Sequence, residues 1–414
     1  MTRLRFPDGF LWGSATAAHQ VEGGNWMNDW WDWEHRSGSP CAEPSGDACD
    51  HYHRYQEDFA LLERLGQNSH RLSIEWSRIE PAEGEWSKAS IDHYRRVFAS
   101  AAEHGLTLLV TLHHFTSPRW FAAKGGWAEA ANVDYFERFC EKVAQELGDL
   151  IPCALTINEP QVVAGIGYGG SFFPPGLGDR QARHLATRNF IAAHAAAARA
   201  LRSGKGDPEV GLVLATNDLV AETPGVQERR DHIFHTQAQV YLDALETGSV
   251  RGLRIPDEEI PDLRGSSDVV GLNYYTRNFV QSDGRVRGFP PRETEQTTQM
   301  GWEVIPDGLT ECLKLVGSLG KPVIVTENGI GTSDDKRRVA YIRDHLAAVH
   351  RAMEEGVDVR GYMYWTTMDN FEWAYGFRMT FGLIAVDRED GFRRVPKPSA
   401  ELYGEIARTN SVEV

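Results

Sequence analysis

The sequence has few cysteines, and their spacing excludes the sites that cysteines commonly build. Five cysteines are scattered at positions 41, 49, 140, 153 and 312, and none forms a CxxC pair. The sequence therefore predicts neither a disulfide framework nor a zinc site. The histidine pairs His51/His53 and His113/His114 have no cysteine or carboxylate at the spacing of a metal-ligand set, so we expect no metal and no other cofactor.

Positive charge and long apolar runs are also scarce. The chain has 43 lysines and arginines against 59 acidic residues, which gives a formal net charge of −16. Nucleic acids need clustered basic residues, so a neutral small molecule is the expected partner. No apolar run reaches the ~20 residues of a membrane span, and the first residues, "MTRLRFPDGFLWG", do not look like a signal peptide. We therefore expect a cytoplasmic protein with no membrane partner; its oligomeric state stays open.

Short apolar runs alternate with amphipathic helical stretches along the whole chain, and no linker-like segment divides it. The predicted strands span residues 10–15, 69–74, 106–112, 153–157, 210–215, 269–272, 322–326 and 361–365. The predicted helices span residues 54–65, 91–104, 133–147, 182–201, 228–245, 309–319 and 337–354. This alternation favours parallel strands joined by right-handed crossovers. It predicts an α/β fold, a (β/α)8 TIM barrel that forms a single domain over residues 1–414. The absence of a glycine-rich phosphate loop disfavours a dinucleotide-binding sheet.

Polar and aromatic residues follow most of these predicted strands. They are Gln20, Glu75, His113, His114, Asn158, Glu159, Asn273, Tyr275, Glu327, Asn328 and Trp365. In a barrel the carboxyl ends of all strands meet at one face, where barrel enzymes place their active sites. We therefore expect Glu159 and Glu327 to share a pocket.

The two glutamates suggest a specific chemistry. Glu159 precedes Pro160, and a residue before proline is pushed from the helical region toward an extended conformation, which would hold the side chain at the strand end. The alternative is an acid at a helix N-terminus that interacts with the helix dipole. Two carboxylates across a barrel mouth suit glycosidic bond cleavage, with retention at ~5–5.5 Å separation and inversion at roughly 6.5–9.5 Å. The residues alone leave both outcomes open.

Eight motifs, in this order and spacing, resemble glycoside hydrolase family 1, the retaining β-glucosidase family, over essentially the full length. They are "FPDGFLWGSATAAHQVEG" (6–23), "DHYHRYQED" (50–58), "RLSIEWSRI" (71–79), "TLHHF" (111–115), "TINEP" (156–160), "GLNYY" (271–275), "VTENG" (325–329) and "WTTMDNFEW" (365–373). The resemblance implies a retaining exo-β-glycosidase that hydrolyses terminal β-linked sugars of a small glycoside or oligosaccharide through a covalent glycosyl-enzyme. It implies a β-glucosidase with β-galactosidase or β-fucosidase side activity.

The resemblance also implies roles for single residues. Glu159 matches the acid/base and Glu327 the nucleophile, with Arg71 and Tyr275 placed to keep the nucleophile charged. The remaining matches form the sugar-binding set, with Trp365 as a stacking floor before a cis peptide to Thr366: Gln20, His114, Asn158, Asn273, Tyr275, Trp365, Glu372 and Trp373. Amide, imidazole and carboxylate groups match vicinal hydroxyls, and an aromatic face packs against sugar C–H groups.

The sequence departs from the family pattern in a few places. Phe115 and Thr116 stand where the family usually shows Trp and Asp, and Gln161 stands where many relatives have an aromatic that lines the leaving-group site. In the tryptophan-rich segment 25–35, some rings are expected to pack and one to line the entrance.

Three alternatives stay open beside the β-glycosidase. A 6-phospho-β-glycosidase typically lacks the glutamate at 372 and has a Lys/Tyr pair where this chain has Met379 and Phe381. A catalytically silent sugar-binding barrel would usually have lost one of the two glutamates. A transglycosylase uses the same residues with another acceptor.

Overall fold

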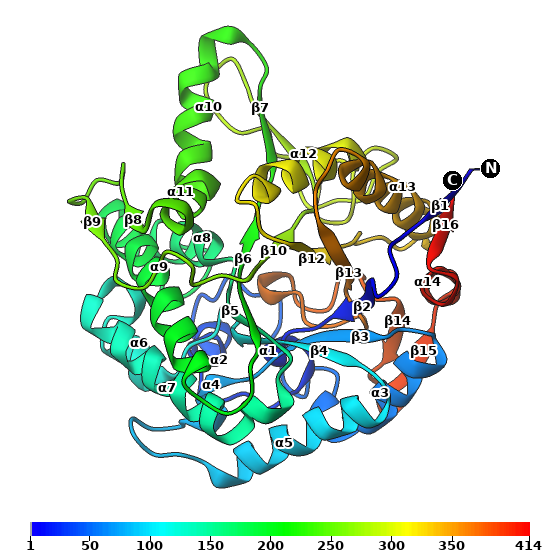
Figure 1. Ribbon diagram of the computed structural model, residues 1–414, viewed down its shortest axis with the longest axis horizontal. Helices are drawn as coiled ribbons and strands as arrows, with labels where there is room; N and C mark the ends of the chain where they lie inside the picture. Colours follow the sequence, from blue (N-terminus) through cyan, green and yellow to red (C-terminus); the bar gives the residue numbers. More distant parts are fainter. Residues whose placement is uncertain (1) are drawn as a thin grey trace.

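The structure is a computed structural model that describes residues 2–414. Eight parallel strands form a closed barrel in which each strand pairs with the next, and β13 closes the ring on β2 (Figure 1). In order around the barrel they are β2 (Leu11–Ala15), β3 (Ser69–Ser73), β4 (Thr107–His113), β5 (Cys153–Asn158), β6 (Glu209–Ala215), β10 (Val269–Asn273), β12 (Val323–Asn328) and β13 (Val359–Trp365). All eight predicted strands and the (β/α)8 fold are confirmed.

A ring of helices surrounds the barrel (Figure 1). After successive strands the main helices are α3 (His51–Arg64), α5 (Lys88–Glu103), α7 (Val133–Leu147), α9 (Arg180–Arg202), α10 (Gln227–Phe234) with α11 (Val240–Thr247), α12 (Pro306–Gly317), α13 (Asp335–Glu354) and α14 (Pro398–Thr409). The predicted helix 228–245 is divided by the π-helical segment η6 (His235–Gln239). The predicted set omitted α14, which begins with a proline at its first turn and buries residues three apart, at Ala400, Tyr403 and Ile406.

Short elements lie in the loops. Between β2 and β6 they are α1 (Ala18–Val21), α2 (Asp29–His35), α4 (Trp76–Ile79), α6 (Arg119–Ala123), η1 (Gly126–Ala128), η2 (Ala130–Asn132), η3 (Gly148–Leu150), α8 (Pro160–Val162) and η4 (Val163–Tyr168). Later come β7 (Asp218–Ala221), η5 (Pro224–Val226), β8 (Ser249–Val250), β9 (Glu258–Glu259), β11 (Arg277–Val280), η7 (Trp373–Tyr375), β14 (Ile384–Asp387) and β15 (Arg393–Pro396). At the two ends of the chain, β1 (Arg3–Arg5) pairs with β16 (Ser411–Glu413).

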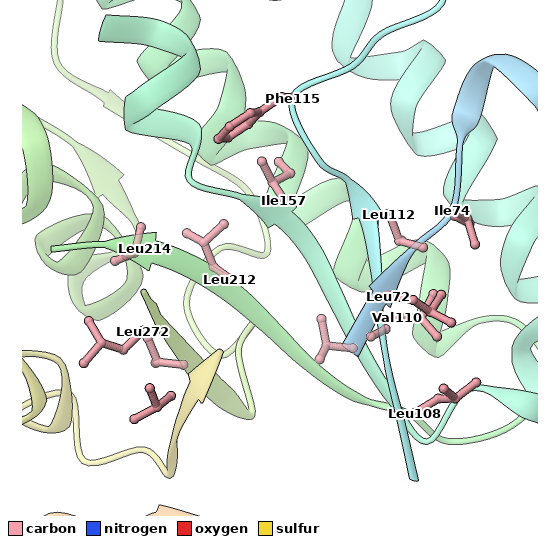
Figure 2. Close-up of a cluster of buried hydrophobic side chains, with 14 of the residues drawn as sticks. Leu72, Ile74, Leu108, Val110, Leu112, Phe115, Ile157, Leu212, Leu214 and Leu272 are labelled. Carbon is pink, nitrogen blue, oxygen red and sulfur yellow. The ribbon is translucent and has the colours of Figure 1, made fainter. Parts of the chain in front are cut away.

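The alternation of side chains along each strand separates two apolar layers. Between strands and helices lies the layer that Figure 2 shows, which contains Leu72, Val110 and Ile157. The other layer fills the barrel interior and includes Leu109 and Leu155. Successive residues of a strand point to opposite faces, so Arg71, the neighbour of Leu72, points into the barrel. This register brings a buried cation beneath the carboxyl ends of the strands.

Among residues 2–414, no helix combines the length and the apolar character that a membrane crossing requires.

Candidate active site

A cavity of about 310 Å³ lies at the carboxyl ends of the barrel strands and contains both glutamates. Of the predicted site residues, it is lined by His114, Glu159, Tyr275, Glu327, Trp365, Glu372 and Trp373. Arg71, Asn158 and Asn273 lie behind this surface and bond to the two glutamates or to one another. The expected shared pocket is therefore present.

Glu327, near the end of β12, is held through both carboxylate oxygens. Arg71 Nη1 donates to Oε1 at 2.6 Å, and the Tyr275 hydroxyl donates to Oε2 at 2.6 Å. Arg71 is fully buried and donates also to Thr111 Oγ1 at 3.2 Å and to the Thr326 carbonyl at 3.1 Å. The guanidinium thus has one fixed position, from which it neutralises Glu327.

Two opposing effects act on the protonation of Glu327. Burial raises the pKa of its carboxyl above the ordinary value, while the positive charge of Arg71 and the hydrogen bond from Tyr275 lower it. Two short bonds from strong donors favour the ionised form. Glu327 is therefore the carboxylate of this cavity that is best placed to carry the negative charge.

Glu159 has a different environment. Burial, followed by the negative charge of Glu327, raises the pKa of Glu159 to about 8. Its Oε1 accepts a hydrogen bond of 2.7 Å from Asn273 Nδ2, a neutral donor. Glu159 is thus protonated at neutral pH, whereas Glu327 is held by a cation and a hydroxyl. Such a difference of environment is what an acid and a nucleophile require.

The backbone of Glu159 differs from the prediction. The expected extended conformation is wrong, because Glu159 has φ 48° and ψ 54°, in the left-handed region. Its N–H donates to the Val213 carbonyl of β6 at 2.9 Å, and its carbonyl accepts from the Val162 N–H at 2.9 Å as α8 begins. These two bonds outweigh the local preference before Pro160. The side chain still stays at the strand end, outside the right-handed helical region.

An amide network connects the two glutamates. Asn158 Oδ1 accepts from Arg71 Nη2 at 2.7 Å and from Asn273 Nδ2 at 3.1 Å. Because Oδ1 is engaged by these donors, Asn158 Nδ2 points toward His114 Nε2, 3.2 Å away. The chain of contacts from Glu327 through Arg71, Asn158 and Asn273 to Glu159 fixes both carboxyl groups in one rigid arrangement.

The predicted sugar-binding residues gather at one end of the cavity. The His114 ring is nearly parallel to Trp365 and to Trp373, with centroids 6.0 Å and 6.1 Å away. The Trp365–Thr366 peptide is cis, as the resemblance implies. Burial and the charge of Glu327 raise the pKa of Glu372 to about 8.

Gln20 does not line the cavity but lies beside Glu372. Its Nε2 donates to the Phe371 carbonyl at 2.8 Å and contacts Glu372 Oε2 at 3.4 Å. Its Oε1 is buried and has no hydrogen-bond partner within residues 2–414. His113, by contrast, has a structural role, because its Nε2 accepts from Trp127 Nε1 at 3.3 Å away from the cavity.

Several lining residues were not identified from the sequence. They are aromatic and apolar side chains in loops, chiefly Ile166, Phe172, Phe173, Met300, Trp302 and Tyr375. Loop segments carry no periodicity that would mark which side chain faces the cavity. Gln161 is turned away, since its amide donates to the Ala215 carbonyl at 2.6 Å, and Val162 lines the cavity in its place.

The tryptophan-rich segment also differs from expectation. Within the described chain, no tryptophan of residues 25–35 lines the active-site cavity. Trp30 is buried and packs against Trp373, with ring centroids 4.6 Å apart. Trp30 thus supports from behind a ring that lines the cavity.

Comparison with known proteins agrees with this geometry. The family model described as Glycosyl hydrolase family 1 matches residues 2–412. The chain belongs to glycosyl hydrolase family 1. It is 32% identical to "Beta-glucosidase A" of Acetivibrio thermocellus, over 99% of this chain and 100% of that protein. It is 34% identical to the "Bifunctional beta-D-glucosidase/beta-D-fucosidase" of Bifidobacterium breve, over 96% of this chain and 97% of that protein.

Solved structures of the family have the same fold as this chain. The β-glycosidase from Pyrococcus horikoshii superposes with a TM-score of 0.90 at 38% identity, over 100% of this chain and 97% of that one. The family, the barrel and the two glutamates identify the protein as a glycoside hydrolase.

Proposed function

We propose that the protein is a retaining exo-β-glycosidase that releases terminal glucose-like sugars by double displacement. The observation that carries the proposal is the asymmetry of the two glutamates: Glu327 bonds to Arg71, whereas Glu159 has a neutral donor and a pKa of about 8. Glu327 attacks the anomeric carbon while Glu159 donates its proton to the leaving oxygen. Water then attacks the glycosyl-enzyme, Glu159 takes the proton of that water, and Glu327 leaves as carboxylate.

Membership of glycosyl hydrolase family 1 supports retention, and the amide network fixes the separation of the two acids. Retention requires both carboxyl groups close to the anomeric carbon, without room for a water between nucleophile and sugar. Arg71 contacts Glu327 and Asn158, and Asn273 contacts Asn158 and Glu159, so three side chains span the distance between the two acids.

The sugar-binding end supports a neutral glucose-like ring. Trp365 offers its face, and His114, Glu372 and Trp373 surround the position of the hydroxyls, with Gln20 behind Glu372. Relatives include a β-glucosidase, a bifunctional β-D-glucosidase/β-D-fucosidase and the "Beta-galactosidase" of Pyrococcus woesei, so we propose β-galactosides and β-fucosides as secondary substrates. The substrate is a small β-glycoside or oligosaccharide. The cytoplasmic location stays a prediction, and the oligomeric state stays open.

A 6-phosphorylated sugar fits this cavity poorly. With the Glu372 pKa at about 8, the carboxyl is largely neutral at pH 7, so its charge is not the main obstacle. The obstacle is that no lysine or arginine lines the cavity within the described chain, and a buried phosphate without a cation is costly. We expect kcat/KM for nitrophenyl β-glucoside to exceed that for its 6-phosphate by more than tenfold; a preference for the phosphate would contradict this reading.

The two glutamates are tested by substitution. Glu327→Gly should abolish hydrolysis, and azide or formate should restore part of it by attacking the anomeric carbon from the vacated space. Glu159→Ala should slow substrates with poor leaving groups far more than nitrophenyl glucoside, because a good leaving group needs no proton. Wild-type activity in a folded Glu327→Gly variant would show that the nucleophile is another group.

A further inference from the structure

A second cavity of about 220 Å³ adjoins the active-site cavity. The two cavities share the lining residues Thr276, Asn278, Met300, Trp302 and Tyr375. None of the residues that bind the sugar in the proposed function lines the second cavity within residues 2–414. Its further lining includes Phe289, whose side chain is 45% exposed, so this cavity lies toward solvent.

The topology places the second cavity on the leaving-group side. Glu159, which donates the proton to the leaving oxygen in the proposed function, is bonded to β6 through Val213 and to β10 through Asn273. Thr276 lies between β10 and β11, Asn278 lies in β11, and both residues line both cavities. These two residues therefore connect the cavity that contains Glu159 to the second cavity.

The side chains of the second cavity suit a neutral sugar. The half-buried Asn278 side chain has no hydrogen-bond partner within the described chain, so its amide is free to donate to and accept from hydroxyls. Trp302, Tyr375 and the exposed Phe289 add aromatic faces, which pack against sugar C–H groups.

The charges of the second cavity are paired. Arg277 Nε donates to Asp218 at 2.5 Å, and Arg287 bonds to Glu222 and lies 3.7 Å from Glu303. With both cations neutralised, an anionic group such as a phosphate or uronate finds no free positive charge there. The cavity thus offers aromatic faces and an amide without net attraction for anions, and its volume accommodates one hexose ring.

We propose that this second cavity binds the second sugar of the leaving group, so that the enzyme prefers β-linked gluco-oligosaccharides of three or more units to disaccharides. The proposal rests on the proposed function. Binding energy gained at a remote sugar raises kcat/KM when it is also present in the transition state.

The test compares chain lengths in wild type. We measure kcat/KM for nitrophenyl β-glucoside and for β-linked glucose dimers, trimers and tetramers, in both the 1,4- and the 1,3-linked series. One additional sugar ring, stacked and hydrogen-bonded in the second cavity, should make kcat/KM for the trimer about fivefold higher than for the dimer in at least one series. The tetramer should show no further increase. Equal kcat/KM values for dimer and trimer in both series would overturn the proposal. Hydrolysis of nitrophenyl β-glucoside by the same enzyme would show that the proposed glycosidase function still holds.

Substitution then locates the effect. Phe289→Ala and Asn278→Ala should bring the trimer-to-dimer ratio of kcat/KM close to one. Val286→Ala is the matched control, because Val286 is 39% exposed in the same segment and does not line the second cavity. It should keep the wild-type ratio. A trimer preference that survives both cavity variants would place the additional sugar elsewhere and overturn the assignment.

Discussion

The hydroxyl of Tyr275 gives the sharpest test of how Glu327 is kept ionised. It donates to Glu327 Oε2 at 2.6 Å, while Arg71 occupies the other oxygen. Tyr275→Phe removes this donor and leaves the ring, so the cavity keeps its shape. The bond favours the ionised carboxylate, and its loss must therefore raise the pKa of Glu327.

The magnitude follows from the strength of the bond. A hydrogen bond to a charged group contributes about 1.5–3 kcal/mol, and one pKa unit corresponds to about 1.4 kcal/mol. We therefore expect the acid limb of the kcat/KM profile, which reports ionisation of the nucleophile in the free enzyme, to move to higher pH by about one to two units. Because Glu159 and Glu327 titrate as an interacting pair, the measured limb belongs to the pair.

The assay is kcat/KM for nitrophenyl β-glucoside as a function of pH, for wild type and variant. The neighbouring Tyr274 supplies the control: its hydroxyl donates to the Ile305 carbonyl at 2.7 Å, outside the cavity. Tyr274→Phe should lower the free energy of unfolding by about 1 kcal/mol and leave the acid limb in place. If the acid limb of Tyr275→Phe coincided with that of wild type, this hydroxyl would have no part in ionising Glu327.

Two further predictions concern titration and stability. With the pKa of Glu159 at about 8, kcat/KM should fall above about pH 8 as the acid loses its proton, and Glu159→Gln should remove that alkaline limb together with most activity on poor leaving groups. Away from the site, burial opposes ionisation of Asp58, but its bonds to Arg394 (2.7 and 2.8 Å) and to His51 (2.7 Å) outweigh burial and lower its pKa. Asp58→Asn should thus lower the free energy of unfolding, measured in urea at neutral pH, by about 3–5 kcal/mol. In wild type the same stability should persist above the unfolded aspartate pKa of about 3.9 and decline as pH falls below it; a pH-independent stability there would refute the ion pair's contribution.

The strands of the barrel could be predicted because burial on both faces leaves a simple signal. Each of β5, β10 and β12 is buried along its whole length, and such strands appear in the sequence as short apolar runs bounded by turns. The helix boundaries were less predictable. Periodicity does not reveal the π-helical segment at His235–Gln239, because a wider turn changes the spacing by one residue only.

The site could be predicted where its residues stand at strand ends and not where they stand in loops. The fold itself determines that Glu159 and Glu327 meet, since parallel strands of a barrel share one face. The direction of Gln161, by contrast, depends on a single bond to the Ala215 carbonyl. The left-handed conformation of Glu159 depends likewise on bonds to β6 and α8. Such tertiary contacts cannot be inferred from the conformational preferences of the local sequence.

The balance of charge in the cavity explains how one barrel end holds three carboxyl groups. Glu159, Glu327 and Glu372 all line it, and burial raises the pKa of each. Burial also lowers the pKa of His114 well below its ordinary value, so the imidazole is neutral and Arg71 is the cation that contacts a carboxylate there within the described chain. One buried cation compensates one buried anion, and additional charge would be uncompensated. The cavity therefore holds its single negative charge at Glu327, beside Arg71, and keeps protons on Glu159 and Glu372. In the proposed function, the proton on Glu159 is the one that the leaving oxygen receives, and the proton on Glu372 is available as a hydrogen-bond donor to a sugar hydroxyl.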